Sequence, residues 1–330
     1  MNLDLNPSTM SLATFNTLLC AYETTVRQKM RTKALAKSKS KSKSRSKAKA
    51  EAKADQTQIN KRAVPSNQEG EEDLESVAEQ VREFLGLDEW RYDVLPALVE
   101  ERREGKERRG GGGGGYLSKE ELVRLMEWKL KHGVYRPTLL GMIRQNQDKI
   151  ITDATAVAFS SLSASDEVNE NLETIERVLS TLATPLRGVG PATASLMLSV
   201  ACPEMIPFYS DDVYLWVCVG VYPSSSSPDS SSKGNKKVKP NGELNVKYNV
   251  AEYRKLWEGV QGLRARLNEK IEEGKLVSCK DVERVALVVR HFELSGLAVC
   301  KKGEKEEDQE DEEANPGEVS ECGRRKRRRV

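Results

Sequence analysis

Apolar residues recur along most of the chain at the spacing of one helix face. In the segment that begins near Glu72, the side chains of Leu74, Val77 and Val81 are three or four positions apart, which indicates a helix with one buried side. No strong alternation of apolar and polar residues, the pattern of a half-buried strand, is visible. We therefore predict an all-α fold. The predicted helices cover residues 74–85, 90–99, 118–132, 137–146, 148–162, 166–183, 191–202, 211–220, 249–272 and 279–294.

Several of these helices have recognisable first turns. Ser118 and Glu121 predict a capping box, in which each side chain satisfies a free backbone N–H of the other residue. Ser278 and Asp281 repeat this pattern with aspartate in place of glutamate. Pro137, which suits the first turn of a helix, opens another helix. These signals place the starts of three predicted helices.

Polar segments precede the helical region. Residues 27–53 are rich in Lys, Ser and Ala. Because their like charges repel and they have little to bury, we expect residues 1–71 to be mostly disordered. This Lys/Ser-rich segment is either a phosphate-binding arm or a solvated linker. A short apolar stretch at 15–22 leaves open a helix that docks on the domain.

One helical domain is expected over residues 72–300, with two flexible insertions. Residues 101–115 include six consecutive glycines, which cannot hold a fixed backbone. Residues 223–242 form a loop rich in Ser, Pro and Lys. Residues 301–330 are first acidic and then basic, and we expect them to be disordered.

The basic cluster from Arg324 to Arg329 has the composition of a nuclear localisation signal. We expect an import receptor to bind it and the protein to act in the nucleus. The acidic run before it offers a surface to basic nuclear proteins. The net charge of +2 conceals these blocks, because 53 Lys and Arg residues offset 51 Asp and Glu residues.

The composition argues against several kinds of site. None of the six cysteines is part of a CxxC pair, and two histidines are too few for most metal sites. We therefore expect no zinc site, no iron–sulfur cluster and no other cofactor. Because no apolar run approaches the length of a membrane span and no signal peptide is recognisable, we expect no membrane association.

The most informative segment runs from Leu186 to Ser195 with the sequence LRGVGPATAS, and apolar helical stretches flank it. Gly188 and Gly190 permit a tight turn and the close approach of another backbone. Pro191 suits the first turn of the next helix, whose free N–H groups can bind a phosphate. The segment is either a phosphate-binding hairpin or an ordinary corner between two helices.

With these residues the segment resembles the helix–hairpin–helix motif of the DNA glycosylase superfamily, which holds one DNA strand through backbone amides. The resemblance is best over residues 172–217 and implies a two-lobed helical domain that binds double-stranded DNA. Together with the stretches EWKLKHGVYRP and IPFYSDDVYLWV, the segment is similar to a little-characterised branch, the Amun-like proteins. The DNA-binding residues that we expect are Arg187, Gly188, Val189, Gly190, Ala192, Thr193 and, outside the hairpin, Arg136.

In that superfamily the hairpin is followed by an aspartate at the start of the next helix. Asp211 and Asp212 both match this position, and the spacing does not choose between them. Breaking an N-glycosidic bond develops positive charge on the sugar, which a nearby carboxylate stabilises while it activates water. The alternative is that the segment Ser210-Asp211-Asp212 only caps a helix.

A base that leaves the DNA stack needs a pocket with aromatic walls. Tyr209, Trp128 and Tyr214 are the predicted candidates, and the alternative for each is an ordinary place in the core.

One departure from the superfamily limits the chemistry that the resemblance implies. Bifunctional members carry a nucleophilic lysine two residues after the second hairpin glycine, where this chain has Ala192. The resemblance therefore implies a monofunctional glycosylase without a lyase step through a hairpin lysine.

Lys129 stands on the apolar stripe of its predicted helix, with Leu122 and Met126. Either its side chain reaches out to water at the end of the helix, or it points into a cleft between subdomains. In such a cleft it would pair with Asp211 or Asp212, or contact a phosphate. Desolvation there would lower the pKa of the amine and make it a nucleophile.

Three functions fit these residues. The first is a monofunctional DNA glycosylase that acts in base-excision repair, which depends on the hairpin and on Asp211 or Asp212. The second is a DNA-binding module that kept the fold and lost the chemistry. The third is a nuclear interaction protein that recruits partners through its charged tails. The sequence identifies neither a damaged base nor an oligomeric state.

Overall fold

The computed structural model describes residues 3–53, 68–107, 115–134, 136–163, 172–223 and 236–297; for 41–53, 68–73, 106–107 and 163 it gives only the course of the helix. Across these ranges the elements are helical, and the β-structure consists of one isolated bridge between Val238 and Leu244. The predicted all-α class is confirmed. In this part of the chain, none of the helices has both the length and the apolar character that a membrane span requires.

Helix α13 (Cys279–Arg290) is buried along most of its length, and the capping box predicted at Ser278 and Asp281 opens it. The Ser278 hydroxyl oxygen accepts a hydrogen bond from the Asp281 N–H at 3.0 Å. The residues from Val285 to Val289 are all buried. The helices that pack around α13 are α1 (Leu12–Cys20), α2 (Tyr22–Lys53), α11 (Asp211–Val213) and α12 (Val250–Asn268).

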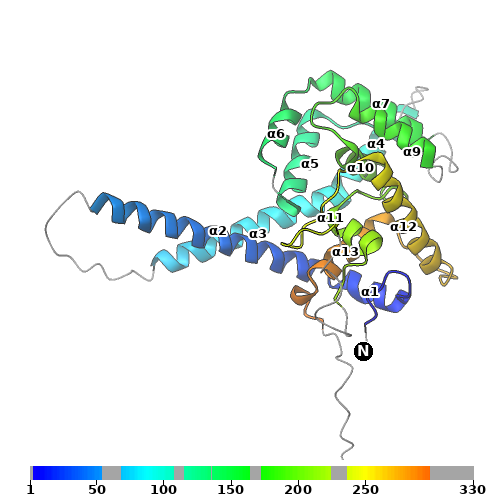
Figure 1. Cartoon of the computed structure of the whole chain (residues 1–330). Helices are drawn as coiled ribbons and strands as arrows, with labels where there is room; N and C mark the ends of the chain where they lie inside the picture. Colours follow the sequence, from blue (N-terminus) through cyan, green and yellow to red (C-terminus); the bar gives the residue numbers. More distant parts are fainter. Residues whose placement is uncertain are drawn as a thin grey trace, which may run out of the picture.

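The remaining helices complete the fold in Figure 1. The predicted capping box at Ser118 and Glu121 is present at the start of α5, and Gly133 ends that helix. Where the sequence predicted two separate helices over 74–99, one helical segment continues through a π-helical turn. These elements are α3 (Gln68–Glu89), η1 (Trp90–Val94), α4 (Leu95–Glu107), α5 (Lys119–His132), α6 (Pro137–Arg144), α7 (Asp148–Ser163), α9 (Leu172–Ala183), α10 (Pro191–Ala201), η2 (Tyr214–Val219) and η3 (Phe292–Leu294).

Helix α2 corrects the expectation that residues 1–71 are mostly disordered. It lies beside α3, and the two helices extend together away from the body (Figure 1). The apolar residues Val26, Met30 and Ala34 are four positions apart and buried, which gives the first part of α2 a packed face. Ala and Lys are also good helix formers. The expectation of disorder for 54–67 and for the tail 301–330 falls outside the described residues.

The first residues of the chain dock on the body. The open question at 15–22 is answered by α1, whose Phe15 and Leu18 are fully buried. The Trp216 indole N–H donates to the Leu5 carbonyl at 2.9 Å. Arg266 donates to the carbonyls of Pro7 and Met10 at 2.9 and 2.7 Å. The N-terminal segment is therefore part of the folded domain.

Both predicted insertions are partly ordered. Residues 101–107 continue α4, and the Arg102 guanidinium donates to both carboxylate oxygens of Glu121 at 2.8 and 2.6 Å. Residues 236–242 form a turn that the isolated bridge closes. Side-chain anchoring and backbone pairing thus fix segments that composition alone assigned to flexible loops. The remainder of each insertion lies outside the described residues.

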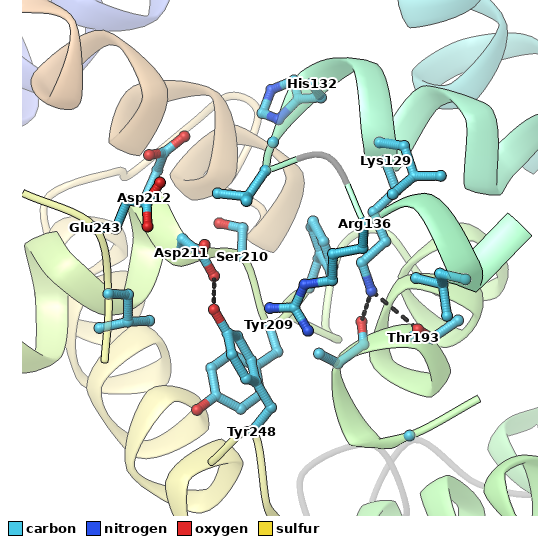
Figure 2. A pocket seen from close by; sticks show the side chains of 18 of the residues that line it. Lys129, His132, Arg136, Thr193, Tyr209, Ser210, Asp211, Asp212, Glu243 and Tyr248 are labelled. Atoms are coloured by element: carbon cyan, nitrogen blue, oxygen red, sulfur yellow. Dashed lines mark hydrogen bonds between the residues drawn. The ribbon is translucent and has the colours of Figure 1, made fainter. Parts of the chain in front are cut away.

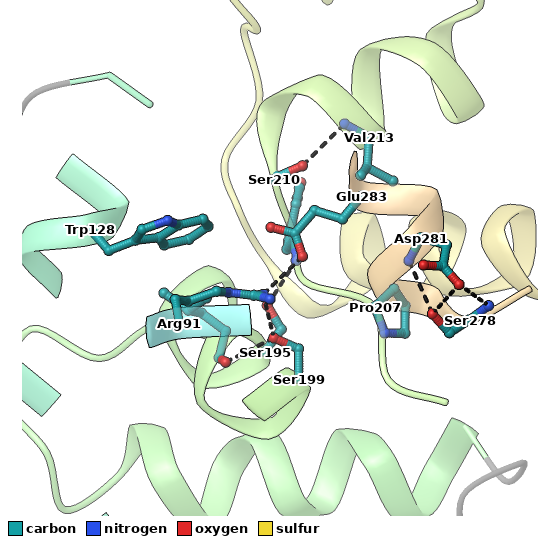
Figure 3. A network of polar contacts seen from close by, with 12 residues as sticks. Arg91, Trp128, Ser195, Ser199, Pro207, Ser210, Val213, Ser278, Asp281 and Glu283 are labelled. Atoms are coloured by element: carbon teal, nitrogen blue, oxygen red, sulfur yellow. Dashed lines mark hydrogen bonds and ion pairs between the residues drawn. The ribbon is translucent and has the colours of Figure 1, made fainter. Parts of the chain in front are cut away.

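A buried ion pair joins three of the elements (Figure 3). Arg91 of η1 donates to the Glu283 carboxylate of α13 at 2.8 Å and to the Ser199 hydroxyl of α10 at 3.1 Å. The two charged side chains are only 1% and 3% exposed. The Arg91 guanidinium also lies over the rings of Tyr92 and Trp128, at 4.1 and 4.8 Å from their centroids. The pair therefore fixes how these elements sit against one another.

We expect Arg91→Ala to lower the free energy of unfolding by about 3–5 kcal/mol, because it leaves the Glu283 carboxylate buried without its partner. Urea unfolding followed by circular dichroism measures this loss. The control is Arg82→Ala, since Arg82 pairs with Glu75 and Glu79 in largely exposed contacts that contribute about 0–1 kcal/mol. Equal losses in the two variants would contradict the role given to the buried pair.

Candidate functional site

A cavity of about 520 Å³ lies where α5, α6, the turn between α9 and α10, and residues 208–212 meet. Helix α2 and the segment that holds Glu243 and Tyr248 complete its wall, and residues 290–291 at the end of α13 also line it. Figure 2 shows carboxylate, amine, guanidinium and phenol groups converging on it. Its volume suits a small organic group.

The turn between α9 and α10, which together with the first turn of α10 we call the hairpin, depends on one glycine. Gly188 has a φ of 78°, and a Cβ atom on it would lie 3.0 Å from the Met142 Cβ of α6. Gly190 differs, because its backbone is extended and nothing lies within 4 Å of the place of a Cβ atom. The predicted close approach thus occurs at Gly188, while Gly190 borders open space at the start of α10.

Asn146, a residue that sequence reasoning missed, holds the hairpin in place. Its side-chain oxygen accepts a hydrogen bond from the Arg187 N–H at 2.8 Å, and its side-chain N–H donates to the Arg187 carbonyl at 3.0 Å. The Arg187 side chain is exposed and does not line the cavity. Asn146 thus fixes the backbone of the turn and leaves the arginine side chain at the surface.

The structure divides the predicted DNA-binding residues into two groups. Val189 is buried and, like Arg187, lies outside the cavity lining. At the first turn of α10, the N–H groups of Thr193 and Ala194 already donate to the Gly190 carbonyl, at 2.9 and 2.8 Å. The residues of this set that line the cavity are Gly188, Gly190, Ala192, Thr193 and Arg136.

The two aspartates open α11 without capping it. Ser210 is the N-cap, and its hydroxyl oxygen accepts a hydrogen bond from the Val213 N–H at 3.1 Å. Both Asp211 and Asp212 line the cavity. Asp211 accepts a hydrogen bond from the Tyr248 hydroxyl at 2.8 Å. The segment thus forms a helix start, as one alternative expected, and presents both carboxylates to the cavity.

Burial raises the pKa of the Asp211 carboxyl above its ordinary value, and the charge of Asp212 acts in the same direction. The Tyr248 hydrogen bond and the positive charges of Arg136 and Lys129 act against it. Asp211 is therefore a carboxylate with increased affinity for a proton.

Tyr248 is a second residue that sequence reasoning missed. It has a φ of 55°, an uncommon conformation for a residue other than glycine, and such strain is often found at ligand sites. The Arg136 guanidinium lies 4.7 Å from the centroid of its ring. Tyr248 thus places its hydroxyl on Asp211 and its ring beside Arg136 (Figure 2).

Lys129 points into the cavity, as the second of its two sequence alternatives predicted. Its Nζ donates to the Ala192 carbonyl and to the Thr193 hydroxyl, both at 3.0 Å, and so contacts the hairpin rather than either aspartate. Desolvation lowers the pKa of the amine to about 7; Arg136 acts in the same direction and Asp211 opposes it. Near neutral pH the site therefore holds a partly uncharged amine.

The predicted aromatic wall is only partly present. Tyr209 lines the cavity, although its side chain is mostly buried. Trp128 and Tyr214 lie in the core and do not line the cavity, which corrects their assignment to a base pocket. Their polar atoms are satisfied there, because the Trp128 N–H donates to Asp88 at 2.8 Å and the Tyr214 hydroxyl accepts from Lys237 at 2.9 Å.

Helix α2 adds basic residues that the sequence analysis placed in a disordered segment. Lys29 and Lys33 line the cavity, and Lys33 donates to the Lys131 carbonyl at 2.7 Å. Burial lowers the pKa of the Lys29 amine, although the negative charge of Asp212 acts to raise it. Burial also lowers the pKa of His291, to about 4, so this side chain is neutral at pH 7.

In the described residues, no His, Cys, Asp and Glu side chains form a cluster suited to a metal ion.

Comparisons with protein-family models, with curated proteins and with solved structures found no match. The candidate site is therefore interpreted from its own geometry.

We expect Lys129→Met to change stability in a pH-dependent way. The pKa of Lys129 is about 7 in the folded protein and near 10.5 when unperturbed. Between these two pH values Lys129 is protonated in the unfolded chain and mostly unprotonated in the folded protein. The free energy of unfolding therefore rises with pH across this range. Below pH 7 the folded protein must bury the charged amine, which disfavours folding. The variant should therefore gain more stability, relative to the native chain, at pH 6 than at pH 10.

Urea unfolding of both proteins at pH 6 and pH 10 measures this difference. Lys131→Met is the matched control, because Lys131 lies on the same helix and its side chain is exposed. A stability difference between Lys129→Met and the native chain that stayed constant with pH would contradict desolvation of the Lys129 amine.

Proposed function

We propose that this chain binds duplex DNA at the hairpin and hydrolyses the N-glycosidic bond of a base placed in the cavity. One observation carries the proposal: the Asp211 carboxylate shares a cavity with the hairpin residues Gly188 and Gly190 and with the cationic side chain of Arg136. The resemblance of the sequence to helix–hairpin–helix DNA glycosylases supports it. The two-lobed fold of that superfamily is part of the same proposal.

The hairpin offers features that suit a phosphate group. Gly190 is exposed, lacks a side chain and borders open space at the start of α10, so that another backbone can come close. The N-terminus of a helix carries partial positive charge and attracts anions. The exposed Arg187 side chain adds a full positive charge on the same turn. These contacts would hold one DNA strand without reading its bases.

The cavity supplies the groups that the bond cleavage needs. Asp211 can stabilise the positive charge that develops on the sugar and accept a proton from the attacking water. Its hydrogen bond from Tyr248 fixes the carboxylate. The positive charge of Arg136 favours the electron density that gathers on the departing base. Of the two aspartates that the sequence left open, this arrangement favours Asp211.

The alternative is a DNA-binding module without catalysis. It is supported by the places of Trp128 and Tyr214, because two of the three aromatic residues predicted to receive a base lie in the core instead. Action in the nucleus, an import receptor and basic nuclear partners remain predictions from tails that lie outside the described residues.

We expect Asp211→Asn to lower base release by about 100-fold or more, the range typical of a positioned acid or base group, and to leave DNA binding intact. The assay incubates the protein with duplexes that each carry one damaged or mismatched base and detects abasic sites with hot alkali. Asp148→Asn is the matched control, because Asp148 also opens a helix but is exposed at the surface. Salt-sensitive binding without release from any duplex would favour the non-catalytic module.

We expect Arg187→Ala to weaken binding to any duplex sequence and to reduce the slope of log K against log salt concentration by about 1, since one phosphate contact is lost. Fluorescence anisotropy over a series of salt concentrations measures the slope. Arg177→Ala serves as the control, because Arg177 is exposed on α9 away from the turn. An unchanged slope in Arg187→Ala would show that DNA does not contact the hairpin arginine.

A further inference from the structure

The hydrolysis proposed above leaves one reactive group of the cavity without a role. Lys129 comes from α5, and its Nζ lies on the hairpin, where DNA would be held. An amine at such a place has two uses: as a cation it contacts phosphate, and as a neutral amine it attacks a carbonyl carbon. The surroundings of Lys129 decide between these uses.

These surroundings make the neutral amine available near neutral pH. Its pKa of about 7 leaves about half of the side chains uncharged near neutral pH, because burial and the nearby Arg136 disfavour the cation. A neutral amine has two N–H bonds and one lone pair. The carbonyl of Ala192 and the hydroxyl oxygen of Thr193 are two acceptors for those N–H bonds. The lone pair then remains for an electrophile, and Lys129 lines the cavity that would hold it.

We propose that Lys129 forms an imine with the aldehyde of an abasic sugar and thereby cleaves the DNA strand on the 3′ side of that sugar. This inference rests on the proposed function, because release of a base leaves a sugar whose ring-opened form is an aldehyde. The substrate class is therefore an aldehyde within a phosphodiester strand, which is the product of base release.

The reaction needs no oxidant or reductant. The Lys129 lone pair forms a bond to C1′ while one proton of the amine passes to the aldehyde oxygen. The Asp211 carboxyl, whose raised pKa favours its protonated form, then gives its proton to the resulting hydroxyl, which leaves as water. A protonated imine and the Asp211 carboxylate remain. Asp211 accepts the proton from C2′, and the electron pair of that C–H bond shifts toward C1′. The C3′–O bond then breaks, with its electron pair leaving on the 3′ phosphate. Water hydrolyses the imine and returns the free amine and an unsaturated aldehyde.

Asp211 is suited to the proton transfer. It lines the same cavity, and its charge influences the pKa of Lys129. Burial raises the pKa of its own carboxyl, which makes it a stronger base than an exposed aspartate.

Lys29 is the competing amine in the cavity. Burial lowers the pKa of Lys29 as well, but this residue belongs to α2, and the charge of Asp212 influences its pKa more than the charge of Asp211 does. No hydrogen bond to the hairpin is found for it among the described contacts. The contacts with Ala192 and Thr193 thus assign the chemistry to Lys129.

The test uses the full chain and a duplex with a single abasic site made beforehand, so that its result does not depend on base release. Sodium borohydride reduces an imine to a stable amine and joins protein to DNA, which a denaturing gel detects. We expect the native chain and Lys131→Met to give the covalent adduct and the cleaved strand, and Lys129→Met to lose both. Binding to the same duplex and the unfolding curve are measured for each variant.

Each outcome bears on the inference. Loss of the adduct in Lys129→Met, with folding and DNA binding retained, supports it. An adduct that persists in Lys129→Met, or that is lost only in Lys29→Met, overturns the assignment to Lys129. Binding of the native chain without any adduct overturns the lyase step and leaves the proposal of base release to its own assay. Absence of DNA binding overturns both proposals.

Discussion

The arrangement of the helices depends on the buried contact between Arg91 and Glu283. Two charges removed from water are tolerated only where each satisfies the other and further polar or aromatic partners surround them. Here Ser199 accepts a second hydrogen bond from Arg91, and the Trp128 ring lies against the guanidinium. The Trp128 N–H in turn donates to the Asp88 carboxylate. Asp88 also accepts a hydrogen bond from the Tyr22 hydroxyl of α2 at 2.9 Å. One network thus ties η1, α10 and α13 to α5 and to the N-terminal helices.

This network also positions the candidate site. Trp128 and Lys129 are neighbours on α5, so that fixing the indole in the core directs the next side chain toward the hairpin. Glu283 lies on α13, whose last residue, Arg290, lines the cavity together with His291. The cavity walls are therefore held by contacts that do not themselves line the cavity.

Local signals in the sequence were enough for most helices of the body. The capping pairs at Ser118 and Ser278 specify first turns through atoms three residues apart, and both are present. Helix α2 was missed because its buried residues, such as Val26 and Met30, are sparse among lysines and serines and become a packed face only when α3 lies beside them. That information belongs to the tertiary structure and not to a local pattern.

The candidate site also contains residues that the sequence indicated and residues that only the tertiary structure reveals. Lys129 was recognisable, because a lysine on an apolar stripe conflicts with its neighbours, and the two aspartates were recognisable from the resemblance. Tyr248 and Asn146 gave no such signal, since their contacts with Asp211 and Arg187 join residues 37 and 41 positions apart. Ala192 stands where the resemblance would place a nucleophilic lysine, so the sequence predicted no amine at the hairpin. The structure instead brings an amine there from another helix.

The docking of residues 5–20 on helices from later in the chain has a consequence for how the protein folds during its synthesis. The contacts of Leu5 with Trp216 and of Met10 with Arg266 span 211 and 256 positions. Contacts of such separation form slowly, because a long loop must close before they stabilise anything. Helix α1 therefore lacks its docking surface on α13 and Arg266 until these later residues have been translated. During that interval its apolar face is available to chaperones.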